Sequence, residues 1–237
     1  MSAVAIALAA CTSRAPHSAQ LRDAAATAPA TPEPWYEAEI KAFEQADRDS
    51  PPRPGAVLFV GSSSIRMWNS LESDMAGWRV VNRGFGGSKT TEVLAVTDRI
   101  VLPHQPSAIV YYCGDNDLGE NNTDSAAAAQ GFIDFCEHIH KRLPETAILY
   151  LAIKPSLARW ANWPAMNRAN ELVASYASKH NHVEFVDVAS CLLGPGGTPD
   201  PALYASDGLH LSAAGYARWT PIVRRHLAEV VKPRPTP

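Results

Sequence analysis

The chain has 237 residues, of which 46% are hydrophobic, and this size and composition suit one globular domain. Its 21 Lys and Arg residues against 24 Asp and Glu residues give a formal net charge of -3, which excludes a summed positive field that would hold a nucleic-acid backbone. The longest apolar run, residues 3–10, is too short to cross a bilayer as a helix. No two cysteines form a Cys-x-x-Cys pair, which argues against a zinc knuckle, an iron–sulfur site and a disulfide-stapled miniprotein.

The first eleven residues join an apolar stretch to a cysteine at position 11. Residues 8–11, Leu-Ala-Ala-Cys, resemble the lipobox of a bacterial lipoprotein signal, although no Lys or Arg precedes the apolar stretch as is usual in such signals. The resemblance implies cleavage before Cys11, a lipid on its sulfur, and a protein anchored in the cell envelope that faces the periplasm. The alternative is an apolar N-terminus without order on a cytoplasmic or secreted protein.

Composition divides the rest of the chain into three parts. Residues 12–34 are rich in Ala, Ser, Thr and Pro and predict a disordered tether, because they offer too little apolar surface to bury. In residues 232–237 every second position is proline, which prevents a helix and predicts a disordered tail. The folded domain is therefore expected at 35–231.

Short apolar runs alternate with helix-like segments through this domain. The runs lie at 56–60, 78–81, 108–113, 147–152 and 183–188. Between the last two, apolar residues at helical spacing from Met166 to Ala177 predict a helix. Continuous apolar strands that alternate with helices indicate a parallel sheet with helices on both faces. The sequence thus predicts an α/β fold, a three-layer sandwich with a central parallel sheet.

Four polar or glycine-rich segments follow these elements, and the carboxyl ends of parallel strands are where functional groups gather. They lie at 61–65, 82–88, 114–117 and 207–212. Acyl transfer needs a nucleophile, a base, a group that orients the base, and donors for an oxyanion. Ser63 at a strand-to-helix turn, His210 and Asp207 can fill the first three roles. The backbone amide of Gly87 and the side-chain amide of Asn116 can fill the last.

With these residues in this order, the chain resembles the SGNH hydrolases, also called the GDSL esterase/lipase superfamily, in its platelet-activating-factor acetylhydrolase-like branch. The resemblance implies a flavodoxin-like sandwich and an esterase that cleaves a carboxylic ester through an acyl-enzyme. It implies that Ser63 is the nucleophile, with Gly87 and Asn116 as oxyanion donors. Asp207 would orient His210, the base, and no metal or organic cofactor is implied.

Three departures from the family pattern leave choices open. Ser62 replaces the aspartate of the first motif, so three adjacent serines compete, and Ser63 is favoured because it aligns Gly61 and Trp68 with the family's positions. Asp115 stands where threonine is common and is expected to point outward. Gly86 competes with Gly87 as the oxyanion glycine, since both suit a tight turn.

The sequence leaves two alternatives open for the residues that could contact the substrate, and it offers one group of residues that could be considered for a metal. Trp160 and Trp163, with Arg159, follow the fourth strand and either wall a substrate pocket or merely cover the helix behind them. Arg66 and Trp68 either face the site or pack beneath it. Cys136, His138 and His140 lie on different helix faces, which excludes one shared metal.

The expected substrate is a short acyl ester, such as an acetyl group on a cell-envelope sugar, with a lysophospholipid as second choice. The partners expected are therefore small-molecule, glycan or lipid esters, with the membrane reached only through the lipid anchor. Two other readings stay open: an envelope-anchored glycan-binding protein without catalysis, and an acyltransferase that uses the same residues. Oligomeric state is left open.

Overall fold

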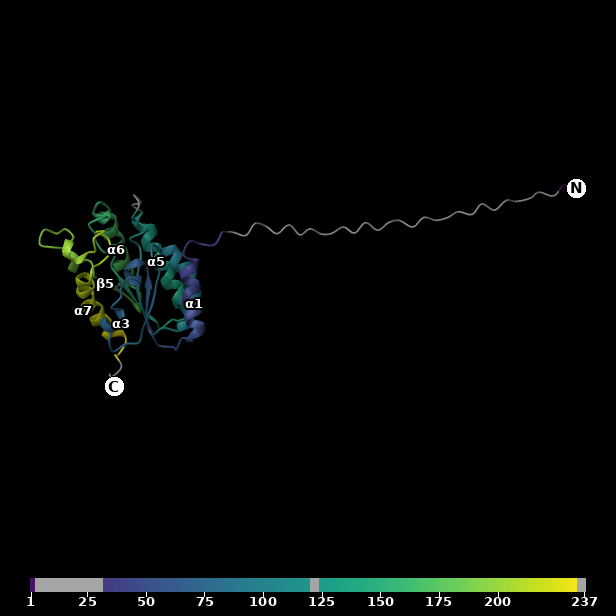
Figure 1. Ribbon diagram of the computed structural model, residues 1–237, viewed down its shortest axis with the longest axis horizontal. Helices are drawn as coiled ribbons and strands as arrows, with labels where there is room; N and C mark the ends of the chain where they lie inside the picture. The colour runs from purple at the N-terminus through teal and green to yellow at the C-terminus, as the bar shows by residue number, and fades with distance from the viewer. Residues whose placement is uncertain (3–31, 120–123, 234–237) are drawn as a thin grey trace. The chain divides into compact units, whose positions relative to one another are not determined.

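The computed structural model describes residues 1–2, 32–119 and 124–233 (Figure 1). The chain divides into two units, Met1–Glu33 and Pro34–Pro237, and nearly all of the first lies outside the described residues. The predicted lipobox with Cys11, most of the predicted tether and most of the predicted tail also lie outside them. Within the described ranges, no helix has both the length and the apolar character that spanning a membrane requires.

The second unit is built on a five-stranded parallel sheet with the strand order β2-β1-β3-β4-β5. The strands are β1 (Val57–Gly61), β2 (Val80–Gly84), β3 (Ala108–Tyr112), β4 (Ala147–Leu151) and β5 (Val183–Val186). Val57 pairs with Val80 on one side and with Ala108 on the other, so the first residues of these three strands are in register. This is the flavodoxin-like order of a doubly wound sheet, and the predicted fold class is confirmed.

Helices cover both faces of the sheet. Alternate residues of each strand point to opposite faces and pack into two separate hydrophobic cores. Leu58 and Val60 belong to the core under the first helix layer, and Val57 and Phe59 to the core under the second. The first layer contains α1 (Glu37–Asp49), α4 (Thr90–Ile100), α5 (Ser125–His140) and α6 (Trp163–Ala177). The second contains α2 (Ser63–Arg66), α3 (Leu71–Asp74) and α7 (Ala213–Val230). Figure 1 shows α1 and α5 on one side of the sheet and α3 and α7 on the other.

The described residues also contain four short 3-10 helices: Leu102–His104, Trp160–Asn162, Ser190–Leu192 and Pro201–Leu203. The second core is centred on Trp68, whose ring stacks on Tyr216 and meets Phe59 and Trp219 edge-on. Burial of one such large side chain contributes about 1.5–3 kcal/mol, so this aromatic cluster holds α2 and α7 firmly against β1.

The second strand begins and ends later than its apolar run predicts. The run at 78–81 indicated a strand that ends before Asn82, but β2 extends to Gly84 and includes Arg83. Arg83 is buried there because Asp47 of α1 pairs with its guanidinium and the ring of Phe43 lies against it. An edge strand can carry such polar residues when another element supplies their partners, and hydropathy alone does not show those partners.

Candidate active site

Ser63 is the serine of the first motif that faces solvent and the histidine. Gly61, which precedes it, has φ +137°, and a Cβ there would lie 1.8 Å from the carbonyl oxygen of Tyr112, so only glycine fits. The chain then turns, and α2 begins at Ser63. Ser62 and Ser64 are fully buried, whereas Ser63 Oγ lies 3.0 Å from His210 Nε2.

Asp207 shapes the turn that carries His210. Its Oδ1 accepts hydrogen bonds from the amides of Leu209 and His210, both at 2.9 Å, and its Oδ2 lies 2.6 Å from His210 Nδ1. Gly208 between them has φ +65°, a conformation that favours glycine. The hydrogen bond from the His210 side chain, followed by those two amides, holds the pKa of Asp207 far below its usual range. The ionised carboxylate favours the tautomer protonated at Nδ1, which leaves Nε2 to accept from Ser63.

The two competing glycines of the second motif differ in where their amides point. The Gly86 amide donates to Glu39 Oε2 at 3.2 Å and is therefore occupied. Gly87 has φ +76°, and within the described part of the chain neither its amide nor that of Ser63 donates a hydrogen bond. These two amides therefore remain for an oxyanion.

Asn116 is held so that one of its amide hydrogens stays available. Its Nδ2 donates to the Ser88 carbonyl at 3.0 Å, and its Oδ1 accepts from Arg159 Nη1 at 3.0 Å. An asparagine amide has two hydrogens, so the second can donate to an oxyanion. Arg159 fixes which end of the carboxamide is the donor.

The five predicted site residues meet at the carboxyl edge of the sheet. A cavity of about 430 Å³ is lined by Ser63, Gly87, Asn116 and His210, together with Arg66 and Arg159. Asp207 stands behind His210. A hydroxyl, a base held by a carboxylate, and three donors around one cavity are the parts that acyl transfer requires.

The expectation that Asp115 points outward is wrong. Its side chain is 3% exposed, and Oδ2 lies 3.1 Å from the ammonium of Lys154 and 3.1 Å from the hydroxyl of Tyr112. Burial pushes the pKa of Asp115 up, but the charges of Lys154 and Arg159 outweigh it and leave the pKa below its usual value. The sequence could not show this, because Lys154 is 39 residues away and only the folded sheet brings it beside Asp115.

The aromatic residues considered for the substrate pocket lie elsewhere. Trp160 and Trp163 stack on each other, with ring centroids 6.1 Å apart, and neither lines the site cavity. Trp163 packs on the hydrophobic core, as expected if this tryptophan covers the helix behind it instead of lining a substrate pocket. Arg159 from the same segment does reach the cavity. Of the other pair, Arg66 lines the cavity and Trp68 is buried.

The residues considered for a metal point to different partners. Cys136 is buried, His138 contacts Asp98 and His140 contacts the Thr146 carbonyl. In the described ranges, Glu184, His226 and Glu229 place one ligand atom each within 4.8 Å of one another. His226 Nδ1 already bonds to Glu184 there, and this group lies on β5 and α7, outside the site cavity.

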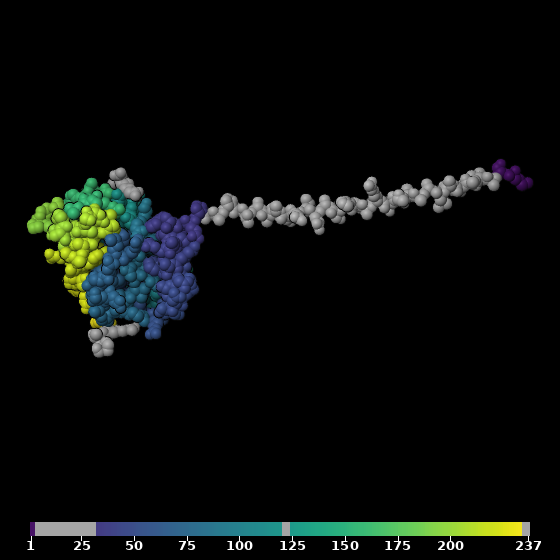
Figure 2. Space-filling view, viewed as in Figure 1, coloured from purple at the N-terminus to yellow at the C-terminus, as the bar shows by residue number. Residues whose placement is uncertain are grey.

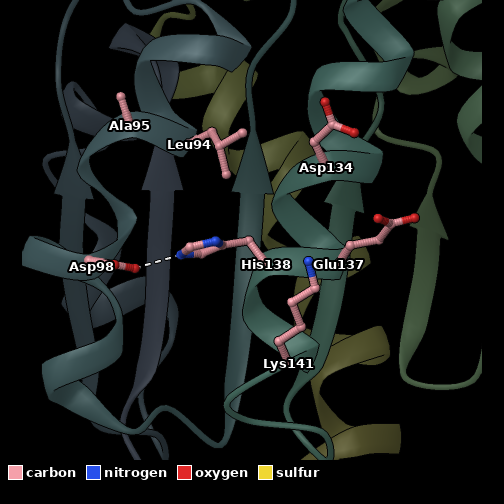
Figure 3. A pocket seen from close by; sticks show the side chains of 7 residues that line it. All are labelled: Leu94, Ala95, Asp98, Asp134, Glu137, His138 and Lys141. Atoms are coloured by element: carbon pink, nitrogen blue, oxygen red, sulfur yellow. Dashed lines mark hydrogen bonds and ion pairs between the residues drawn. The ribbon is translucent and has the colours of Figure 1, made fainter.

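A second groove also holds an aspartate and a histidine. It lies between α4 and α5 and is lined by Asp98 and His138 with five neighbours (Figure 3). Asp98 Oδ1 lies 2.5 Å from His138 Nε2. None of the seven lining residues carries a hydroxyl or a thiol.

The segments that form this site fall within a region that matches a known protein family. The model of the GDSL-like lipase/acylhydrolase family matches residues 59–218, and the chain belongs to that family. No curated protein matches.

Several solved structures share the fold. A Streptococcus pneumoniae protein provisionally described as a platelet activating factor superposes with a TM-score of 0.73 at 25% identity, over 81% of this chain and 92% of that one. A GDSL-like lipase from Bacteroides thetaiotaomicron gives 0.67 at 18% identity, over 82% and 99%. A catalytic mutant of an acetylxylan esterase from Geobacillus stearothermophilus gives 0.58 at 17% identity, over 76% and 95%. The chain is thus an acylhydrolase-family protein of the SGNH fold.

Proposed function

We propose that the protein is a serine esterase that hydrolyses a short acyl ester through an acyl-enzyme. The observation that carries this proposal is the continuous chain from Ser63 Oγ through the His210 ring to the Asp207 carboxylate, with contacts of 3.0 and 2.6 Å. Both contacts are within the range for proton transfer. The family supports acylhydrolase chemistry in general.

In the proposed mechanism Ser63 Oγ attacks the ester carbonyl carbon while His210 Nε2 takes the hydroxyl proton. The carbonyl oxygen becomes an oxyanion, which accepts from the Ser63 and Gly87 amides and from Asn116 Nδ2. The carbon–oxygen bond to the alcohol then breaks, and His210 gives its proton to the leaving oxygen. Water repeats the sequence on the acyl-enzyme, which releases the acid and restores Ser63. Asp207 stays ionised throughout and stabilises the charged His210 ring.

We further propose an acetyl group on a cell-envelope sugar as the substrate, with a lysophospholipid as second choice. A protein of the same fold acts as an acetylxylan esterase, so the fold accommodates deacetylation of a carbohydrate. The lipobox-like segment that ends at Cys11 supports placement in the envelope, beside such sugars. Higher turnover of acetyl and butyryl esters than of long-chain esters supports the first substrate, and the opposite preference supports the second.

The test is turnover of p-nitrophenyl acetate by the full chain and by two serine variants. Ser63→Ala is expected to lower kcat by at least ~10³-fold, because the nucleophile is lost. Ser62→Ala is the matched control, since the Ser62 hydroxyl is buried and has no hydrogen-bond partner in the described residues. It should retain activity within a few-fold. Wild-type turnover that survives Ser63→Ala would assign the nucleophile to another residue.

The competing reading is a glycan-binding protein without catalysis. It predicts a wild type that binds acetylated glycan but turns over no ester, and a Ser63→Ala variant with full affinity. An acyltransferase shares every site residue and is recognised by transfer of the acyl group to an added sugar instead of water.

A further inference from the structure

Two residues that precede the family-matched region in the chain lie against the oxyanion loop, here defined as residues 85–88. They are Trp35, just before α1, and Glu39 in the first turn of α1, whereas the family match begins at residue 59. In Figure 2 this early part of the unit, in purple-blue, lies on the surface beside later segments. Neither residue belongs to a recognisable motif.

Trp35 is exposed but held in place. It is 60% exposed, yet its indole N–H donates to Glu92 Oε1 at 2.8 Å. Its ring meets Tyr36 edge-on at 5.3 Å, and Tyr36 packs on Phe85 of the oxyanion loop at 5.3 Å. An exposed tryptophan fixed from two sides presents a rigid apolar wall.

That wall borders the glycine assigned to the oxyanion. A Cβ built on Gly87 would lie 3.3 Å from Cη2 of Trp35, in the six-membered part of the indole. A group that extends past Gly87 on the side of this Cβ position therefore comes within contact distance of the indole. This contact, in addition to φ +76°, explains a glycine at position 87.

Glu39 holds the same loop through two contacts. Its Oε2 accepts from the Gly86 amide at 3.2 Å, and its Oε1 lies 3.2 Å from Arg66 Nη1. The Glu39 and Arg66 side chains are 35% and 54% exposed, so the ion pair adds little stability. Its effect is positional, because it ties the loop that carries Gly87 to α1 and to the end of α2.

The strand order indicates which part of an ester would meet Trp35. The oxyanion loop follows β2 at one edge of the sheet, whereas His210 comes from the segment between β5, at the opposite edge, and α7. The leaving oxygen must lie near His210 to receive its proton. The carbonyl oxygen points at the Ser63 and Gly87 amides, so the acyl substituent takes the remaining direction on that carbon, away from the leaving oxygen and His210 and on the side of the cavity where β2 and Trp35 lie.

We propose that Trp35 is the residue that limits acyl-chain length, and that Glu39 is a positioning residue for the oxyanion loop. This rests on the proposed esterase function. The indole lies beside Gly87, which lines the cavity, so that a long acyl chain extending past this glycine meets it. Glu39 keeps the Gly87 amide aimed at the oxyanion.

The first experiment measures kcat/KM for p-nitrophenyl acetate, butyrate and octanoate with the full chain. Trp35→Ala is expected to raise the ratio of octanoate to acetate by at least about tenfold, the lower end of what one methylene contributes in an apolar pocket. Trp35→Phe should raise it by less. Trp78→Ala is the control, because this half-buried tryptophan precedes β2, does not line the site cavity, and donates its indole hydrogen bond to the Val231 carbonyl. It should lower the melting temperature and leave the ratio unchanged. A ratio unchanged in Trp35→Ala would overturn the role of Trp35.

The second experiment separates position from stability at Glu39. Glu39→Ala is expected to lower kcat by about tenfold with KM within about twofold, since the loss falls on the transition state. Glu39→Gln should recover most of kcat, because its carbonyl can still accept from Gly86. An unchanged kcat in Glu39→Ala, or no recovery in Glu39→Gln, would overturn the positioning role. If turnover does not depend on Ser63, the esterase function and this inference fail together; if it does, these variants decide the inference alone.

Discussion

Asp207–His210 and Asp98–His138 are two of the Asp–His pairs in the described residues, and only the first belongs to a site built for chemistry. Asp207 and His210 are 2.6 Å apart at the carboxyl edge of the sheet, and Asp98 and His138 are 2.5 Å apart between α4 and α5. The histidine hydrogen bond is the largest cause of a lowered aspartate pKa in both pairs. Local electrostatics therefore do not distinguish them.

The two pairs differ in the partners of the histidine ring nitrogens and in the backbone hydrogen bonds to the aspartate. Two amides lock the Asp207 carboxylate, and the far nitrogen of His210 faces the Ser63 hydroxyl. His138 uses Nε2 for Asp98, the same nitrogen that lies 3.1 Å from Arg142 Nη1. A carboxylate and an imidazole thus make a site only where strand-end loops add a nucleophile and oxyanion donors.

The strongest way to break this comparison is to remove each histidine in turn. His210→Ala should lower kcat for p-nitrophenyl acetate by ~10⁴-fold, because a triad member is lost. His138→Ala should change kcat by less than about twofold, as expected for a surface position. A large loss in His138→Ala would place chemistry in the α4–α5 groove and contradict the assignment.

The next largest effect is expected from the oxyanion donor that the α4–α5 groove lacks. Asn116→Ala should lower kcat by ~10²–10³-fold, since one donor to the transition state is removed. Asn116→Asp, which keeps the shape but not the donor, should lose a similar factor. Activity retained in Asn116→Asp would show that the side chain acts by packing rather than by donation.

The buried pair Asp115–Lys154 beneath the active site is expected to affect the stability of the fold. Lys154→Met should lower the free energy of unfolding by about 3–5 kcal/mol, because it leaves the buried Asp115 carboxylate without its main partner. The double variant Asp115→Asn with Lys154→Met should regain part of this loss. Urea unfolding at neutral pH measures both, and an unaltered midpoint in Lys154→Met would mean that the pair contributes nothing.

The smallest effect concerns the exposed Asp98. Its pKa is lowered by His138, so the folded state binds fewer protons than the unfolded chain, and the stabilisation is complete above the ordinary Asp pKa of ~3.9. It is lost as the pH falls through the lowered pKa. Because the side chain is 55% exposed, Asp98→Asn should cost less than about 1 kcal/mol at pH 7, and the difference should vanish in acid. A cost that persists at pH 2 would point to packing instead of charge.

Much of the fold could be predicted because it rests on local patterns. Apolar runs mark β1, β3, β4 and β5, most clearly β3 and β4, in which every residue is buried. The same reasoning misplaced β2, whose Arg83 is buried by Asp47 of α1. A strand that depends on a distant partner cannot be delimited from its own hydropathy.

The candidate site divides in the same way. Ser63, Asp207 and His210 could be located because their turns have local requirements, such as glycine at 61 and 208 and an aspartate three residues before the histidine. Glu39, Trp35 and the Asp115–Lys154 pair left no local signal. Their roles depend on contacts between segments that are far apart in the chain.

The sequence by itself determined the alternation of strands and helices and the order of the catalytic motifs, because these depend on periodicity and on short turns. Only the tertiary structure decided which serine meets the histidine, which glycine keeps a free amide, and where Asp115 finds its counter-charge. Each of these depends on burial and on a partner brought in by another strand or helix. The order of residues along the chain does not show such a pairing, because only the folded sheet brings both residues to the same edge.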